Sequence, residues 1–244
     1  MYDDGFYRWS AQQAARSAPV VMAVVLEHVA PTSVVDVGCG TGHWLRACAE
    51  LAGAEILGLE SEAVPDDQLV VPTDRLRRVD LTQPITLTRT FDLAISLEVA
   101  EHLAPERADG FVRDLTRLAP AVLFSAAIPG QGGTLHRNEQ PQSYWIRRFA
   151  ACGYDAWDVI RPAIWSDPRV AFWYRQNTFL FVDPAVYGHA PERAPVVADL
   201  SVLTSRPSPR ARRIARRVTR RIAPRPDHPP QRSRWAVRHP DHRG

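Results

Sequence analysis

The sequence predicts an α/β protein in which helices cover both faces of a mostly parallel sheet. Short apolar segments that are typical of strands recur along the chain, and segments that are typical of helices separate several of them. Strands that alternate with helices form parallel sheets, because the chain crosses back over the sheet before the next strand begins. The 244 residues suffice for one such domain with a sizeable core and an extension.

The first half of the chain contains the clearest elements. The aromatic residues of segment 2–16 suggest a cap, and residues 18–29 are expected to form a helix that leads into the first strand. Helices are also expected at His43–Leu51 and at Pro105–Leu118. Pro105 suits the first turn of the second one. Strands are expected at Ser33–Val37, Glu55–Glu60, Arg77–Val79, Phe91–Leu97 and Ala121–Ala126.

The second half begins with a glycine-rich loop, Pro129–Thr134, which is followed by a helix expected at Gln142–Cys152. Two further strands, Tyr154–Ile160 and Gln176–Val182, complete the expected sheet. A connection that contains proline and tryptophan joins them.

Composition divides the chain into four parts: a cap segment at 1–30, the main domain at 31–184, a linker at 185–205 and a tail at 206–244. The tail holds 13 arginines and two aspartates, a net charge of +11, which leaves −8 for residues 1–205 out of the total of +3. Its seven prolines and few apolar residues cannot bury enough surface to fold alone, so we expect a disordered tail.

Several classes of protein are excluded by composition. All 30 basic residues are arginine, which rules out a lysine-based mechanism. The three cysteines, Cys39, Cys48 and Cys152, are odd in number and lack metal-ligand spacing, so we expect no disulfide framework, no metal site and a cytoplasmic location. The N-terminus lacks the regions of a signal peptide, and Glu27 and His28 interrupt the apolar run that begins at Ala18, so no membrane span is expected.

The segment Ser33–His43, which reads S-V-V-D-V-G-C-G-T-G-H, is the most informative one. Alternate glycines after a strand let the backbone turn tightly and approach a ligand, while the next helix presents its N-terminal amides. This arrangement indicates a nucleotide-type cofactor. A dinucleotide fingerprint would place its third small residue at position 43, where the chain has histidine, so the spacing argues against an NAD-dependent dehydrogenase.

The string D-V-G-C-G-T-G resembles the first motif of class I S-adenosylmethionine-dependent methyltransferases. This resemblance implies a Rossmann-like, seven-stranded sheet with an antiparallel last strand. It also implies S-adenosylmethionine as cofactor and S-adenosylhomocysteine as product. The cofactor-binding residues that it implies in this string are Asp36, Gly38, Gly40 and Gly42.

The resemblance continues at the ends of the following strands. Glu60 stands where the family has an acid that accepts hydrogen bonds from the ribose hydroxyls, a task suited to a carboxylate. Asp80 matches the acid that contacts the adenine amino group, with Leu81 beside the ring. The segment Phe91–Leu103, which includes Leu97, looks like the motif that passes under the methionine portion. For each acid taken alone, a solvated strand-end residue is the alternative interpretation.

A narrower resemblance covers residues 5–183. The segment Phe124–Trp145, together with the later strings R-P-x-I-W and W-Y-R-Q-N, looks like a group of bacterial methyltransferases of glycan or secondary-metabolite pathways. It implies a small-molecule acceptor, such as a hydroxyl of a sugar, a glycan precursor or a natural-product scaffold.

A hydroxyl acceptor must lose a proton during methyl transfer, so the site needs a base. His136 is the first candidate, since imidazole titrates near neutrality and the preceding loop can deliver it to the pocket. Glu139 is the second, either as base or as the partner that orients His136, and His102 is the third. The alternatives are that His136 and Glu139 cap the helix near Gln142, and that His102 makes a local contact with Glu98.

Aromatic residues are dense between positions 144 and 174, and most are expected to pack in the core. Trp165, Trp173 and Tyr174 are candidates for a wall against a sugar or planar acceptor. Gln176 and Asn177 beside them are candidates for hydrogen bonds to it.

The tail suggests two alternative partners. A nucleic-acid-binding protein or RNA methyltransferase would use the tail as an electrostatic clamp, with an affinity that falls steeply with salt. The negative charge of residues 1–205 and the lack of an N/D-P-P-Y/F motif argue against nucleic acid. A tail that contacts an anionic membrane surface is the other alternative.

Overall fold

The structure, a computed structural model, describes residues 4–61 and 64–189. The expected tail at 206–244 and most of the expected linker at 185–205 lie outside the described residues. The strands are β1 (Ser33–Val37), β2 (Glu55–Glu60), β3 (Leu76–Arg78), β4 (Leu93–Leu97), β5 (Ala121–Ser125), β6 (Asp155–Trp157) and β7 (Phe179–Val182). The α-helices of the described residues are α1 (Asp4–Val25), α2 (His43–Ala52), α3 (Ala108–Leu118), α4 (Gln142–Ala151), α5 (Ile160–Ile164), α6 (Phe172–Asn177) and α7 (Pro184–Tyr187).

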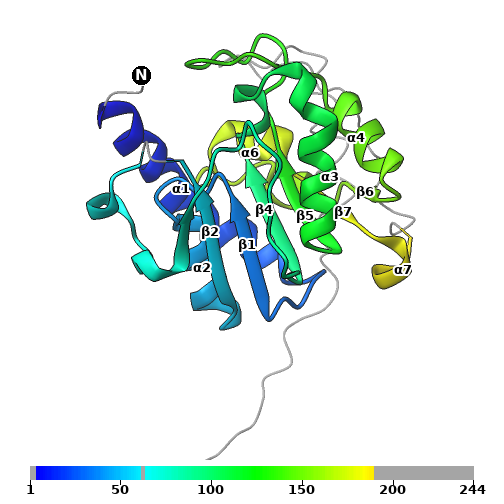
Figure 1. Cartoon of the computed structure of the whole chain (residues 1–244), viewed down its shortest axis with the longest axis horizontal. Coiled ribbons are helices and arrows are strands. Elements are labelled where there is room, and N and C mark those ends of the chain that lie inside the picture. Colours follow the sequence, from blue (N-terminus) through cyan, green and yellow to red (C-terminus); the bar gives the residue numbers. More distant parts are fainter. Residues whose placement is uncertain (1–3, 62–63, 190–244) are drawn as a thin grey trace, which may run out of the picture.

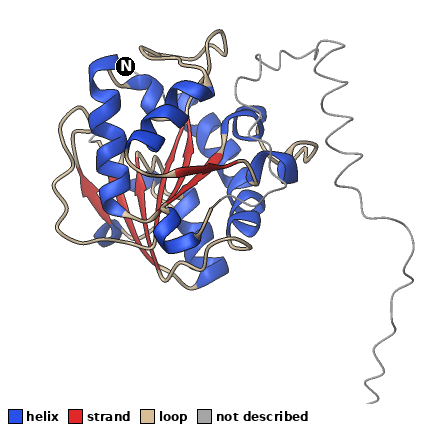
Figure 2. Cartoon of the chain, turned by 90° about the vertical axis from the view of Figure 1, so that its right-hand side faces the viewer, coloured by secondary structure: helices blue, strands red, loops and turns tan. Residues whose placement is uncertain are grey.

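In the described part of the chain, the sheet has seven strands in the order β3-β2-β1-β4-β5-β7-β6 (Figure 1). The first five strands pair in parallel, and β7 runs antiparallel to both of its neighbours, β5 and β6. Helices lie on both sides of the sheet, as the view along its edge shows (Figure 2). The expected Rossmann-like sheet with an antiparallel last strand is confirmed.

The central strands are apolar throughout because both of their faces are covered. Every residue of β4 and of β5 is buried, as parallel strands between two helix layers require. Along β1, Val34 joins the core under α1 and α2, whereas Val35 joins the core under α3 and α4. The sheet therefore separates two hydrophobic cores, and its strand ends are left to form the site.

Helix α1 belongs to the same core as the sheet. Ala18, Val21, Met22 and Val25 are fully buried in the cluster that also contains residues of α2. This helix is much longer than the expected segment 18–29, because its first turns continue into the sequence that suggested a cap.

The connection between the last two strands differs from the expectation. Strand β6 ends at Trp157 rather than at residue 160, and β7 begins at Phe179 rather than at residue 176. The intervening chain forms α5 and α6, which are too short to show a helical period in the sequence. Gln176 and Asn177 therefore lie at the end of a helix and not in a strand. Helix α7 also occupies the start of the expected linker.

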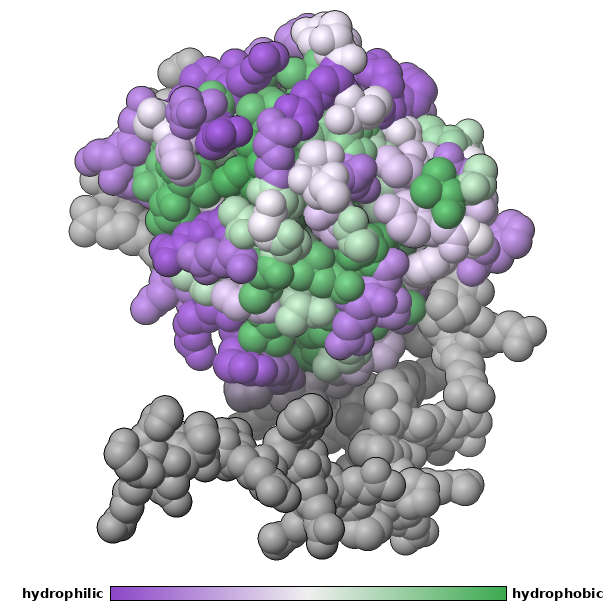
Figure 3. Space-filling model, turned by 90° about the horizontal axis from the view of Figure 1, so that it is seen from below, coloured by the Kyte–Doolittle hydropathy of each residue, from purple (hydrophilic) through white to green (hydrophobic). Residues whose placement is uncertain are grey.

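The surface of the described residues exposes few large apolar side chains. Seen from below, hydrophobic residues gather near the middle of the face and hydrophilic residues surround them (Figure 3). Among the described residues, the large apolar side chains that are clearly exposed are Leu51, Leu135 and Val186, from three separate segments. None of the described helices is both long and apolar enough to pass through a membrane.

Candidate active site

A cavity of about 620 Å³ lies at the carboxyl ends of β1, β2 and β4. Open α/β sheets bind their ligands in this position, since the loops that follow the strands converge there. Helix α1 contributes Ser10, Ala11 and Ala14 to its wall, and α6 contributes Phe172, Trp173 and Tyr174. The rest of the wall includes the loops after the three strands and residues 131–134 with His136.

The three glycines of the turn after β1 have different roles. All have positive φ angles, +80° at Gly38, +55° at Gly40 and +90° at Gly42, which favour glycine. A Cβ on Gly38 would lie 2.5 Å from a Val99 methyl carbon, and one on Gly42 would lie 2.7 Å from a Val71 methyl carbon. A Cβ on Gly40 would meet nothing within 4 Å. Gly38 and Gly40 line the cavity. Gly42 caps α2 and packs on Val71 outside the lining.

Asp36 lies on β1 and faces the cavity while it is only 2% exposed. Its Oδ2 atom is buried and has no hydrogen-bond partner. Burial raises the pKa of its carboxyl well above the usual value, and the nearby Glu60 raises it further. An unpaired buried carboxylate oxygen is unfavourable by itself, so this atom is suited to a ligand that donates a hydrogen bond.

Glu60 ends β2 and reaches across to the glycine turn. Its Oε2 accepts a hydrogen bond from the Gly40 amide at 2.7 Å, and its Oε1 accepts one from the Ser61 amide at 2.7 Å. The carboxylate thus lies between the first two strand ends, with both oxygens held by backbone amides. It lines the cavity, as the resemblance led us to expect.

Asp80, Leu81 and Leu97 line the same cavity. The Asp80 carboxylate accepts hydrogen bonds from the Thr82 amide at 2.9 Å and the Thr82 hydroxyl at 2.7 Å. These two bonds lower the pKa of Asp80, so it is a stable carboxylate at the far end of the site. All the residues expected at the cofactor except Gly42 are therefore gathered around one cavity.

His136 and His102 also line the cavity, and their rings meet. Their ring centroids are 4.8 Å apart at an angle of 78°. The Nδ1 atom of His136 lies 2.8 Å from Glu139 Oε1. The Glu139 carboxylate also accepts hydrogen bonds from the amides of Gly130 and Gly132. It is not among the lining residues, so Glu139 orients His136 from behind and holds the glycine-rich loop.

The electrostatics of the two histidine positions differ. Burial lowers the pKa of His102 to about 4, with a further contribution from the neighbouring His136, so His102 is neutral at physiological pH. Partial burial acts to raise the pKa of Glu139. The hydrogen bonds from His136 and from the Gly130 amide outweigh this effect and lower it overall.

The loop also explains why residue 133 is glycine. A Cβ there would lie 2.1 Å from the Nε2 atom of His136. The ring of His136 therefore packs directly on the backbone of Gly133.

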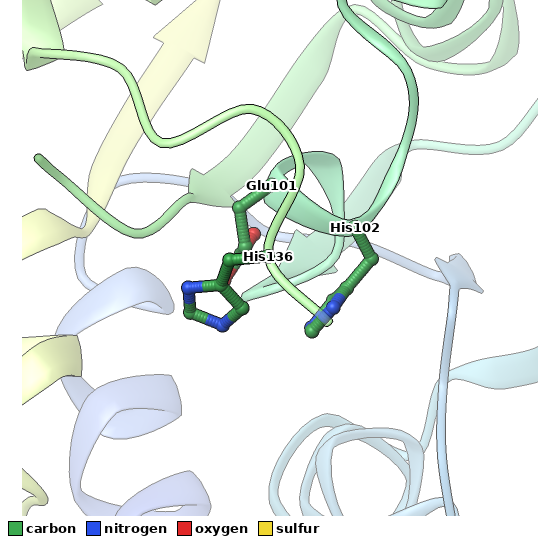
Figure 4. Close-up of side chains that lie close together, drawn as sticks. All are labelled: Glu101, His102 and His136. Atoms are coloured by element: carbon green, nitrogen blue, oxygen red, sulfur yellow. The ribbon is translucent and has the colours of Figure 1, made fainter. Parts of the chain in front are cut away.

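Two acids in the loop after β4, the buried Glu101 and the partly exposed Glu98, were not predicted as site residues. Glu98 and Glu101 both line the cavity, and Glu101 lies beside His102 and His136 (Figure 4). Glu98 has a φ angle of +57°, a conformation that side chains rarely adopt and that often marks a functional position. The signal for them was present in the string E-V-A-E-H, which begins where the strand ends.

Glu98 is held by residues distant in sequence. Its carboxylate accepts hydrogen bonds from Gln131 Nε2 at 2.9 Å and from Asn177 Nδ2 at 3.2 Å. Gln176 and Asn177 are buried in this network rather than displayed beside an aromatic wall. Trp173 and Tyr174 do line the cavity, whereas Trp165 is not among the lining residues.

Comparison with known proteins agrees with this geometry. Residues 9–125 match the family described as "Methyltransferase domain". A comparison with curated protein sequences returned no match.

Several solved structures share the fold at low sequence identity. DesVI from Streptomyces venezuelae is 16% identical, with a TM-score of 0.53 over 73% of this chain and 95% of its own. The sugar N-methyltransferase KedS8 from Streptoalloteichus sp. is 18% identical, with a TM-score of 0.54 over 75% and 92%. CalS10, an amino pentose methyltransferase from Micromonospora echinaspora, is 16% identical, with a TM-score of 0.51 over 75% and 98%.

The cavity suits S-adenosylmethionine. The unpaired oxygen of Asp36 and the open space at Gly40 lie on the same wall as the carboxylates of Glu60 and Asp80. These acceptors match the amino and hydroxyl donors of that cofactor. The family match over residues 9–125, the strand order and this donor and acceptor pattern all agree with a class I S-adenosylmethionine-dependent methyltransferase domain.

Proposed function

We propose that the protein methylates a hydroxyl group of a sugar, a glycan precursor or a sugar-bearing natural product. The observation that carries the proposal is a single cavity lined by two unlike groups of residues, which we call its cofactor wall and its acceptor wall. One wall holds the glycine turn and the carboxylates of Asp36, Glu60 and Asp80. The other holds His102, His136 and the aromatic residues of α6.

On the first wall, the side chains bind the cofactor. S-adenosylmethionine supplies the methyl group, which is carried on a positively charged sulfur. Asp36 offers its unpaired oxygen to a hydrogen-bond donor of the cofactor. Glu60 binds the ribose hydroxyls, and Asp80 with Leu81 binds the adenine.

On the second wall, the side chains act on the acceptor. His136 is oriented by Glu139 at 2.8 Å and lies against His102, so both rings face the cavity in fixed positions. We assign these two histidines to the acceptor hydroxyl and its proton, and Glu139 to the orientation of His136. Phe172 and Trp173 are partly exposed on the same cavity and offer an apolar surface to a sugar ring.

The sugar class has support from outside the site. KedS8 and CalS10 are named for action on sugars, and each covers three quarters of this chain with the same fold. Small-molecule pockets also combine apolar walls with a few fixed polar groups, as this cavity does.

Calorimetric titration of the full chain with S-adenosylmethionine and S-adenosylhomocysteine tests the cofactor wall. The Glu60→Ala variant should bind both at least about tenfold more weakly, because it loses charge-assisted hydrogen bonds of roughly 1.5–3 kcal/mol. Glu55→Ala is the matched control, since Glu55 begins the strand that Glu60 ends and pairs with Arg89 at the surface. It should bind as the parent does.

Absence of binding by correctly folded parent protein contradicts the proposal. The acceptor wall is tested separately by single turnover with a panel of sugars. His136→Ala should keep its affinity for S-adenosylhomocysteine and lose methyl transfer. Equal turnover by His136→Ala and the parent would remove His136 from the reaction.

A further inference from the structure

We propose that Glu101, His102 and His136 bind a divalent transition-metal ion on the acceptor wall. One potential ligand atom of each residue lies within 4.8 Å of those of the other two. Metal–nitrogen and metal–oxygen bonds are about 2.0–2.2 Å, so two ligands on opposite sides of an ion are about 4.2 Å apart. Small side-chain movements are therefore enough to close the three groups on an ion. Figure 4 shows both imidazole rings next to the Glu101 carboxylate.

Glu101 supplies the observation that points to a ligand. Its side chain is fully buried, and no side chain donates a hydrogen bond to either carboxylate oxygen; the donors that act on it are the backbone amides of Glu101 and Ala127. Its backbone carbonyl, in contrast, accepts hydrogen bonds from the amides of Arg137 and Asn138 at 2.7 and 2.9 Å. These bonds fix the segment next to His136 directly over Glu101, while they leave the carboxylate free for a ligand.

The local charge also favours a cation. Glu101 is fully buried, and Glu98, three residues earlier in the same loop, also lines the cavity. Buried carboxylates without a counter-charge are strongly unfavourable, and a divalent ion between them and the imidazoles offsets this cost.

The partner of His136 selects the nitrogen that can bind a metal. Metal-binding histidines commonly donate their second N–H to a carboxylate, which fixes the tautomer. Glu139 holds Nδ1 of His136 in this way and leaves Nε2 as the nitrogen for the ion.

All three ligands line the cavity, so an ion here is accessible to an acceptor. Three protein ligands leave further coordination positions for water or substrate oxygens. A bound hydroxyl has a lowered pKa and releases its proton to solvent. This role of the ion rests on the proposed function. In it, His136 binds the metal ion and does not itself accept the proton of the acceptor hydroxyl.

The ligand set indicates the class of ion. Two imidazoles and one carboxylate suit Mn²⁺, Fe²⁺, Co²⁺ or Zn²⁺, whereas Mg²⁺ and Ca²⁺ prefer oxygen ligands alone. The sequence-based expectation of no metal site came from cysteine spacing, which does not address a site made of glutamate and histidine.

The test is a titration of chelator-treated full-length protein with Mn²⁺. Electron paramagnetic resonance measures the concentration of free Mn²⁺ at each step. The expected result is one Mn²⁺ per chain. Glu101→Gln, which keeps the shape of the side chain and removes its charge, should weaken binding about tenfold or more, and so should His102→Gln. The matched control is His189→Ala, which removes a surface histidine that is also paired with a carboxylate, 2.9 Å away. It should leave this binding unchanged.

Thermal melting and binding of S-adenosylhomocysteine without metal are measured for each variant to show that it is folded. The metal proposal is overturned if the parent protein does not bind Mn²⁺ stoichiometrically. It is also overturned if Glu101→Gln and His102→Gln bind Mn²⁺ as tightly as the parent does. If the folded parent protein does not bind S-adenosylhomocysteine, the proposed function is overturned instead, so the two failures are distinguishable.

Discussion

At the scale of single residues, the cavity is built around buried carboxylates. Asp36 has an unpaired buried oxygen, and no side chain donates a hydrogen bond to the Glu101 carboxylate. Asp114 is equally buried, yet its carboxylate accepts hydrogen bonds from Arg107, Arg117 and the Ile85 amide. The difference between paired and unpaired acids separates residues that hold the fold from residues that are available to ligands.

This contrast gives the first prediction. Asp36→Asn should keep or raise the melting temperature, because it removes a buried ionisable group without a partner. It should weaken S-adenosylhomocysteine binding by about tenfold or more, or roughly 1.4 kcal/mol, measured by calorimetry.

Asp114→Asn is the control at equal burial. It should lower the free energy of unfolding by roughly 3–5 kcal/mol, because it leaves Arg107 without its buried partner. Its affinity for S-adenosylhomocysteine should match that of the parent. A large loss of stability in Asp36→Asn with unchanged affinity would contradict the assignment of Asp36 to the cofactor.

At the scale of elements, hydrogen bonds at the starts of β1 and β4 align the two strands, and the cavity lies at their carboxyl ends. Asp92 precedes β4 and accepts hydrogen bonds from the Thr32 amide and hydroxyl at 2.8 and 2.6 Å. It also accepts them from the amide and hydroxyl of Ser33, the first residue of β1, at 2.9 and 3.0 Å. This cluster holds β1 and β4 in register, so that Asp36 lies opposite Ile95 near their carboxyl ends.

The second prediction concerns the pH dependence of this contact. The hydrogen bonds from Thr32 act first in lowering the pKa of Asp92, so its folded-state pKa lies below the unfolded value of about 3.9. Such a group stabilises the protein above the unfolded pKa, and the stabilisation is lost as pH falls through the folded pKa.

Asp92→Ala should therefore lower the free energy of unfolding by about 1–2 kcal/mol at neutral pH. Thermal melts from pH 7 down to about pH 3 should show the difference from the parent shrinking at the acidic end. A difference that stays constant over this range would mean that packing, and not the charge of Asp92, is responsible.

At the scale of the whole molecule, one cavity collects residues from almost the full length of the described chain. Ser10 on α1 and Tyr174 on α6 line it together. Residues 1–205 carry a net charge of −8 and residues 206–244 carry +11. Among the described residues, every one that lines the cavity precedes position 175.

The third prediction follows from that separation. Deletion of residues 206–244 should leave the dissociation constant of S-adenosylhomocysteine within about twofold, because the described residues alone provide the glycine turn and the carboxylates assigned to the cofactor. Methyl transfer to a small acceptor should also be unchanged.

Binding to RNA and to anionic vesicles at rising salt concentration, with and without the tail, measures what the tail contributes. Loss of methyl transfer to a small acceptor on deletion would show that the tail takes part in the reaction.

The sequence determined the sheet, the glycine turn and the residues that we predict to bind the cofactor. Continuous apolar strands, the glycine spacing and the acids at strand ends are local signals, and the carboxyl ends of parallel strands must meet at one edge. For this reason Asp36, Glu60 and Asp80 could be assigned to one site before the structure was known.

The acceptor wall was decided by the tertiary structure. The pairing of His102 with His136 and the contacts of Glu98 with Gln131 and Asn177 join residues that are 33 to 79 positions apart. No local pattern reports such contacts, because short helices such as α6 show no helical period and burial depends on what packs above a residue. The sequence thus determined which residues we propose for the methyl donor, and only the folded chain brought together the groups that we propose for the acceptor.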